Sequence, residues 1–136
     1  MASDVCTSIP LHRFVDELMT GLLPRAVSRK TLIINQIDRN LAVGSDENLL
    51  AFILWNLLDK AVESTQNECI HVESVCKGEN TMIRVRNAGV YFYRSCATCF
   101  RQVQDAAEKL GGSISIDSLD MGTTVALTLR KNLKAA

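Results

Sequence analysis

The stretch DENLLAFILWNLLDKAVEST, residues 46–65, carries the strongest fold information in this sequence. Its apolar residues recur at three- and four-residue intervals, which predicts an α-helix with one buried stripe made of Leu50, Ile53, Leu54, Leu57, Leu58 and Ala61. Leu49, Phe52 and Trp55 fall outside that stripe, so the helix is apolar over more than half of its circumference. We therefore expect a second structural element or a partner protein to cover the additional apolar surface.

Before this segment, the sequence predicts another helix and one strand. Apolar residues with helical spacing run from Leu11 to Leu22, and Pro24 is expected to kink the helix or to start a new turn. Residues 31–37, TLIINQI, are rich in β-branched side chains and predict a strand. The connection after the strand ends at Ser45, which we expect to cap the second helix.

Two pairs of strands, separated by a third helix, are predicted after residue 65. Residues 69–75 and 81–87 alternate apolar and polar side chains, which indicates strands with one buried and one polar face. A helix over residues 99–110 stops at a glycine pair, and two more alternating strands follow. The order α-β-α-β-β-α-β-β predicts a two-layer α/β sandwich with a mixed, mostly antiparallel sheet and helices on one face.

The composition narrows the class of protein. Of the 136 residues 47 % are hydrophobic, and 15 Lys and Arg balance 15 Asp and Glu, so we expect no nucleic-acid partner. No apolar run approaches the roughly 20 residues that span a bilayer, and the N-terminus lacks a signal-peptide pattern. Five irregularly spaced cysteines do not indicate a disulfide framework. We expect one cytoplasmic domain over residues 1–136, with an ordered core from about 11 to 130.

Three segments together resemble the ATP-binding domain of sensor histidine kinases. Residues 46–65 resemble the kinase segment that ends in Asn-Leu-Leu-x-Asn-Ala. Residues 107–130, AEKLGGSISIDSLDMGTTVALTLR, resemble the closing stretch of that domain, and residues 22–43 resemble its first helix and strand. The resemblance implies the histidine-kinase-like ATPase fold, which is also called the GHKL or Bergerat fold.

The resemblance also implies an ATP site that can be matched residue by residue. Two asparagines one turn apart, of which the second ligates magnesium in the family, correspond to Asn56 and Lys60. The family's Asp-x-Gly word, whose aspartate recognises the adenine amino group, corresponds to Asn87 and Gly89 with Ala88 between them.

The other two parts of the implied ATP site are a glycine-rich lid and a Gly-Thr step. The step at the adenine end is present as Gly122 and Thr123. The lid has no counterpart, because no glycine occurs between Gly89 and Gly111. A phosphate-binding loop without glycine loses the close backbone approach that glycine permits.

These departures from the family pattern favour a site without catalysis. A lysine ammonium at position 60 offers no oxygen ligand to magnesium and repels the cation. An asparagine at position 87 can still form a hydrogen bond with adenine, but it lacks the charge that strengthens the contact. We therefore expect no catalytic residue, no metal site and no resident cofactor.

Our main hypothesis is a degenerate, pseudokinase-like module that regulates two-component-type signalling by binding a protein partner, and that forms a homodimer. The alternative is a divergent ATP-binding kinase, of the histidine or anti-sigma-factor type, that phosphorylates a partner in trans. ATP and magnesium would be its cofactors, or Lys60 would replace the metal and contact the phosphates directly. The simplest interpretation of Lys60 is a solvated side chain, and Asn87 could simply end a strand.

Aromatic residues and a cysteine pair are two further candidates. The segment at residues 91–93 concentrates three of the seven aromatic side chains and can close a vacated pocket or dock a partner. Cys96 and Cys99 form a C-x-x-C word before the third helix, whose dipole would favour redox chemistry of the thiols. A thiol-based sensor is therefore a third alternative function, although ordinary packing or surface cysteines are the simpler interpretation. The candidate interface comprises Leu49, Phe52, Trp55, Tyr91, Phe92 and Tyr93.

Overall fold

The computed structural model describes residues 6–87, 97–119 and 122–130, in which each of the three helices is followed by two strands. In chain order the elements are β1 (Cys6–Pro10), α1 (Leu11–Ser28), β2 (Leu32–Gln36), β3 (Ala42–Asp46), α2 (Glu47–Glu63), β4 (Cys69–Lys77), β5 (Asn80–Asn87), α3 (Ala97–Lys109), β6 (Ser113–Leu119) and β7 (Gly122–Arg130).

The main sheet has five strands in the order β2-β4-β5-β7-β6. Strands β2 and β4 are parallel, and the other three neighbouring pairs are antiparallel. The parallel pair is possible because α2 lies between the two strands in sequence and provides the crossover. Lys77 and Asn80 pair across the β4–β5 hairpin, where Gly78 adopts a left-handed φ of 57°.

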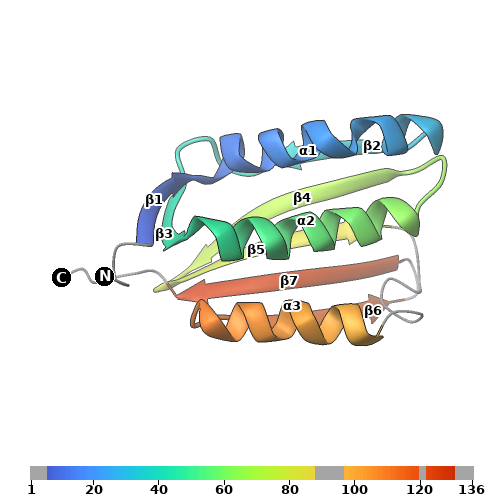
Figure 1. Ribbon diagram of the computed structural model, residues 1–136. Helices are drawn as coiled ribbons and strands as arrows, with labels where there is room; N and C mark the ends of the chain where they lie inside the picture. Colours follow the sequence, from blue (N-terminus) through green and yellow to red (C-terminus); the bar gives the residue numbers. More distant parts are fainter. Residues whose placement is uncertain (1–5, 88–96, 120–121, 131–136) are drawn as a thin grey trace.

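All three helices cover the same face of the main sheet, and α2 lies between α1 and α3 (Figure 1). Side chains on this face are buried, whereas β4 and β5 present charged residues on the opposite face. The predicted two-layer α/β sandwich, with its mixed and mostly antiparallel sheet, is therefore confirmed. The buried side chains of the central strands include Ile70, Val72, Ile83, Val85, Val125 and Leu127.

Helix α2 supplies the centre of the core. The predicted buried stripe is confirmed, since each of its six residues is at most 1 % exposed. Val62 joins the stripe at the end of the helix and is also fully buried. At roughly 1.5–3 kcal/mol for each fully buried large apolar side chain, α2 is the element whose removal would cost the fold most.

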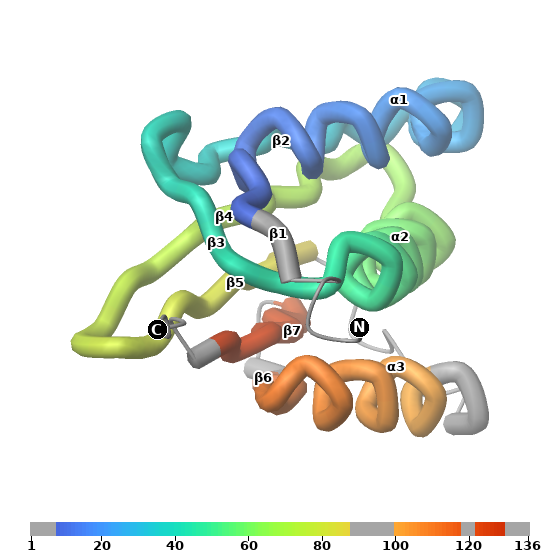
Figure 2. The backbone as a smooth tube through the Cα atoms, turned by 60° about the vertical axis from the view of Figure 1, so that its left-hand side comes forward, coloured from blue at the N-terminus to red at the C-terminus, as the bar shows by residue number. Residues whose placement is uncertain are grey.

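Strands β1 and β3 form a second, two-stranded antiparallel sheet that the sequence analysis did not predict. It lies at the end of the molecule where α1 and α2 begin (Figure 2). Ile9 and Val43 are paired in this sheet and are only 3 % and 9 % exposed. Each strand contains residues that are common in turns, Ser8 and Pro10 in β1 and Gly44 and Ser45 in β3, so it does not stand out from a loop in sequence.

Two helix boundaries also differ from the expectation. Asp46 rather than Ser45 caps α2, because its Oδ1 accepts hydrogen bonds from the backbone N–H groups of Asn48 and Leu49 at 2.9 and 3.2 Å. Ser45 instead belongs to β3 and is buried. Helix α1 continues through Pro24 to Ser28, beyond the apolar spacing that ends at Leu22, and the expected kink at the proline stays a prediction.

Candidate functional site

Asn56 and Lys60, which match the two asparagines of the kinase pattern, lie one turn apart on α2. The side-chain amide nitrogen of Asn56 donates a hydrogen bond of 2.8 Å to the carbonyl oxygen of Phe52 within the same helix. The Lys60 side chain is only 17 % exposed, and its Nζ lies 3.2 Å from Oε1 of Glu63. Lys60 is therefore a half-buried, paired cation rather than a freely solvated side chain.

Glu63 links Lys60 to helix α1. Its other carboxylate oxygen lies 3.5 Å from the Arg25 guanidinium, which also forms an ion pair with Asp59. Because Arg25 contacts both acids, the polar sides of α1 and α2 form one charge network. A phosphate brought to Lys60 would have to compete with the Glu63 carboxylate.

Asn87 ends β5 on the helix-covered face and is only 6 % exposed. Its side-chain nitrogen donates a hydrogen bond of 3.0 Å to Oγ1 of Thr65, directly after α2. The side-chain oxygen is buried and accepts no hydrogen bond from the residues that the structure describes. An unpaired buried acceptor costs about 1–3 kcal/mol, so Asn87 is a candidate for accepting an N–H group from a ligand.

Thr65 connects Asn87 to the beginning of β2. Its carbonyl oxygen accepts hydrogen bonds from Nε of Arg29 at 2.8 Å and from Oγ1 of Thr31 at 3.3 Å. Thr31, Thr65 and Asn87 are all buried, so they form a polar cluster between the end of α2 and the sheet. This cluster has no signal in the sequence, because Thr65 is 34 residues from Thr31 and 22 residues from Asn87 along the chain.

Thr123, from the predicted Gly-Thr step, lies opposite Asn87 in the β5–β7 ladder. It is 2 % exposed, and Gly122 before it has a φ of 142°. The structure therefore brings Asn87 and Thr123 together, while Asn56 and Lys60 lie on helix α2.

Several predicted residues lie outside the described part of the chain. These are Gly89, Tyr91, Phe92, Tyr93 and Cys96. Cys99 is the third residue of α3, as expected for a first-turn position, but only its backbone is described. The predictions for these residues stay predictions.

The apolar residues outside the buried stripe of α2 have different surroundings. Leu49 is half-buried, whereas Phe52 and Trp55 are 41 % and 37 % exposed. The Trp55 ring packs against α1 at Gly21, where an added Cβ would lie 3.0 Å from two ring carbons. Part of the additional apolar surface of α2 is therefore covered by α1, and Phe52 is left at the surface.

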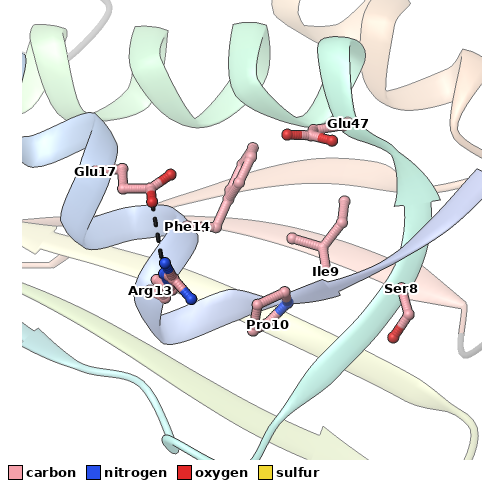
Figure 3. Close-up of a pocket in the computed structure, with 7 residues that line it drawn as sticks. All are labelled: Ser8, Ile9, Pro10, Arg13, Phe14, Glu17 and Glu47. Carbon is pink, nitrogen blue, oxygen red and sulfur yellow. Dashed lines mark ion pairs between the residues drawn. The ribbon is translucent and has the colours of Figure 1, made fainter.

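A surface pocket of about 160 Å³ lies at the other end of α2. Phe14 and Ile9 form its apolar wall, and Arg13 and Glu17, one turn apart on α1, form an ion pair of 3.6 Å on one side of it (Figure 3). Glu47, the first residue of α2, lines the pocket, whereas Thr65, which belongs to the Asn87 cluster, follows the opposite end of the helix. The pocket is thus a helix length away from the Asn87 cluster and contains none of the predicted nucleotide residues.

The helix-free face of the sheet carries a separate charge cluster. Glu73 on β4 lies 2.6 Å from the guanidinium of Arg86 and 3.1 Å from that of Arg84, both on β5. The hydrogen bond from Arg86, together with the positive charges of both arginines, lowers the pKa of the Glu73 carboxyl below its ordinary value, although partial burial opposes the shift.

The described residues contain neither a metal-ligand cluster nor a helix that could span a membrane. Within them, no group of three or more His, Cys, Asp and Glu side chains is arranged to hold a metal ion. None of the described helices combines the length and apolar character that crossing a membrane requires.

No protein-family model matches the sequence, and no curated protein matches it at a significant level. Solved structures do match. Histidine kinase AdeS of Acinetobacter baumannii aligns with a TM-score of 0.84 and 12 % identity, over 94 % of this chain and 68 % of that chain. The mycobacterial sensor histidine kinase MprB aligns with a TM-score of 0.79 and 16 % identity, over 94 % and 99 %.

A third match is histidine kinase ThkA, solved in complex with the response regulator protein TrrA. It aligns with a TM-score of 0.75 and 18 % identity, over 96 % of this chain and 43 % of that chain. Identities this low establish the architecture and leave the activity open. The chain has the fold of the catalytic domains of histidine kinases.

Proposed function

We propose that this chain is a regulatory, protein-binding module of two-component-type signalling that neither hydrolyses ATP nor transfers phosphate. In this proposal it acts in the cytoplasm on a signalling protein and also forms a homodimer. The shared fold supports the signalling class, and the ThkA–TrrA complex supports a response regulator as the kind of partner. The function itself rests on the residues of the site.

The observation that carries the proposal is the ion pair of Lys60. Where the resembled kinases have a magnesium-ligating asparagine, this chain has an ammonium group 3.2 Å from the Glu63 carboxylate. The ammonium repels a divalent cation and offers it no lone pair. The carboxylate repels triphosphate, and Arg25 holds it in place. The Lys60 ammonium therefore opposes binding of the magnesium ion, and the Glu63 carboxylate opposes binding of the triphosphate.

Calorimetric titration with ATP and ADP, with and without magnesium, tests this proposal. We expect no heat and no shift in melting temperature at millimolar nucleotide. Lys60→Asn restores the family's asparagine and should bind nucleotide more tightly in magnesium than the native chain does. Lys109→Asn, at the end of α3, is the matched control for loss of one lysine. Magnesium-dependent binding by the native chain would refute the proposal.

A second candidate function is nucleotide binding without a metal, as in a divergent kinase or a nucleotide sensor. The buried, unpaired oxygen of Asn87 favours this candidate, because it could accept an N–H group of a base. Lys60 would then contact phosphate in place of magnesium. This candidate predicts binding that ignores magnesium, that weakens at least tenfold in Lys60→Ala or Asn87→Ala, and that stays unchanged in Lys109→Ala.

A further inference from the structure

The outer edge of β2 is a surface with no assigned role. Strand β2 is the last strand of the main sheet and hydrogen-bonds to β4 on one side only, within the described residues. Its sequence, LIINQ, contains neither a charged residue nor a proline. Natural proteins usually protect an exposed edge with lysine, proline or a bulge, because free backbone N–H and C=O groups pair readily with another strand.

Apolar side chains surround this edge. Leu32, the first residue of β2, is 65 % exposed, and Leu23 and Val27 of α1 are 46 % and 69 % exposed. Gly21 and Arg25 contact α2. Leu23 follows Gly21 by two residues and Val27 follows Arg25 by two, which corresponds to a rotation of about 200° around the helix axis. They therefore lie on the side of α1 that faces away from α2. Both views place α1 and β2 together along one margin of the molecule (Figures 1 and 2).

We propose that this surface joins two copies of the chain, with β2 of each copy paired antiparallel so that the two sheets become continuous. The proposal rests on the homodimer included in the proposed function, and it specifies the surface. It commits to a second copy because the edge is self-complementary, as a twofold interface requires. An uncharged strand paired with itself brings no like charges together.

Charges just outside the strand support the same pairing. With a twofold axis at Ile34, Leu32 of one copy lies opposite Gln36 of the other, and Ile33 lies opposite Asn35. Lys30 precedes β2 by two residues and Asp38 follows it by two, so each end of the paired strands would bring a lysine of one copy near an aspartate of the other. Both residues are exposed, and the contact would occur twice. Arg29 points away from this edge, since its Nε donates to the carbonyl oxygen of Thr65. The exposed apolar residues of α1 would approach their counterparts along the extended sheet.

Sedimentation velocity from about 1 to about 500 µM protein tests the interface. We expect the native chain to dimerise reversibly, without nucleotide. Leu32→Lys and Val27→Glu should each raise the dimer dissociation constant at least tenfold. Both residues are strongly exposed, so the variants should fold normally. Ser115→Lys places the same charge on β6, the other edge of the sheet, and should dimerise like the native chain.

A charge exchange tests the register. Lys30→Asp and Asp38→Lys should each lose self-association, because like charges then meet twice, and a mixture of the two variants should regain it. A native chain that stays monomeric at the highest concentration overturns both the homodimer and this surface. If the dimer persists in Leu32→Lys, or is lost only in Ser115→Lys, the proposed β2 interface is wrong although the chain still forms a homodimer. Binding of a strand from another protein by a monomeric chain likewise overturns the proposal.

Discussion

The side-chain nitrogen of Asn87 lies 3.0 Å from Oγ1 of Thr65, and the two residues are 6 % and 2 % exposed. This hydrogen bond ties the last residue of β5 to the residue that follows α2 by two positions, so it joins the helix layer to the sheet. The sequence resemblance predicts that the same asparagine stands at the adenine-recognising position, so we expect one side chain to affect both the stability of the fold and any binding of a nucleotide.

A double-mutant cycle should measure this link. Thr65→Val leaves the Asn87 amide nitrogen buried without an acceptor, and we expect the free energy of unfolding to fall by about 1–3 kcal/mol. Asn87→Ala should also destabilise, and the double variant should lose less than the sum of the two. Urea denaturation gives the four free energies. Thr81→Val is the control: the Thr81 hydroxyl is buried without a hydrogen-bond partner, so its removal should cost little or stabilise the fold.

The contact between Gly21 and Trp55 should determine how much Gly21→Ala changes the free energy of unfolding. Glycine inside a helix costs about 1 kcal/mol relative to alanine. A Cβ at position 21, however, would lie 3.0 Å from the Trp55 ring and push it outwards. We therefore expect Gly21→Ala to stabilise a Trp55→Ala background by about 1 kcal/mol and the native chain by less. Equal effects in the two backgrounds would contradict this contact.

Trp55 also reports the same substitution by fluorescence. It is the only tryptophan in the chain, so its emission needs no deconvolution. Displacement of the ring from α1 into water should shift the emission of Gly21→Ala to longer wavelength. Unchanged emission would show that helix α1 moves instead of the ring.

The two glycines after α3 should differ sharply in their tolerance of alanine. A Cβ on Gly112 would lie 2.3 Å from the backbone carbonyl oxygen of Thr128, so the α3–β6 connection or β7 would have to move. We expect Gly112→Ala to lose about 2 kcal/mol or more. Gly111 has free space around it but a φ of 79°, so Gly111→Ala should lose about 1–2 kcal/mol through backbone strain alone. Thermal or urea unfolding ranks the two variants.

The ion cluster at Glu73 should contribute a pH-dependent part of the stability. The pKa of Glu73 is lowered in the folded protein, chiefly by the hydrogen bond from Arg86, so folding favours the ionised carboxylate. The contribution is fully present above the unfolded-state pKa, about 4.3, and is lost as the pH falls through the lower folded-state pKa. The difference in unfolding free energy between the native chain and Glu73→Gln should therefore shrink below about pH 4.

A second variant tests the cause of that pH dependence. Arg86→Gln removes the donor that lowers the Glu73 pKa most, so the folded-state value should return towards the ordinary one. In the Arg86→Gln background, Glu73→Gln should therefore alter the free energy of unfolding at acid pH less than it does in the native chain. A pH dependence that is the same with and without Arg86 would assign the effect to another group.

Residues close together in sequence determined much of what could be predicted. The helical spacing in residues 46–65 was sufficient to identify all the buried residues of α2 except Val62, because burial on one helix face follows directly from a 3.6-residue period. Alternation along β4 and β5 was likewise sufficient to identify the buried and the charged face of the sheet. Strands β1 and β3 were not predicted, because Pro10, Gly44 and Ser45 are more typical of turns than of strands.

Tertiary structure alone decided how the candidate site is paired. The sequence suggested a solvated Lys60, but the side chain is half-buried, and the Glu63 that holds it is itself held by Arg25 from a different helix. Asn87 meets Thr65, 22 residues away, only because the chain returns to the sheet after α2. The sequence by itself therefore determined the order, type and buried faces of the main elements, which follow from local periodicity. Only the tertiary structure decided the partners of each polar side chain, because these partners are brought together by packing between distant segments.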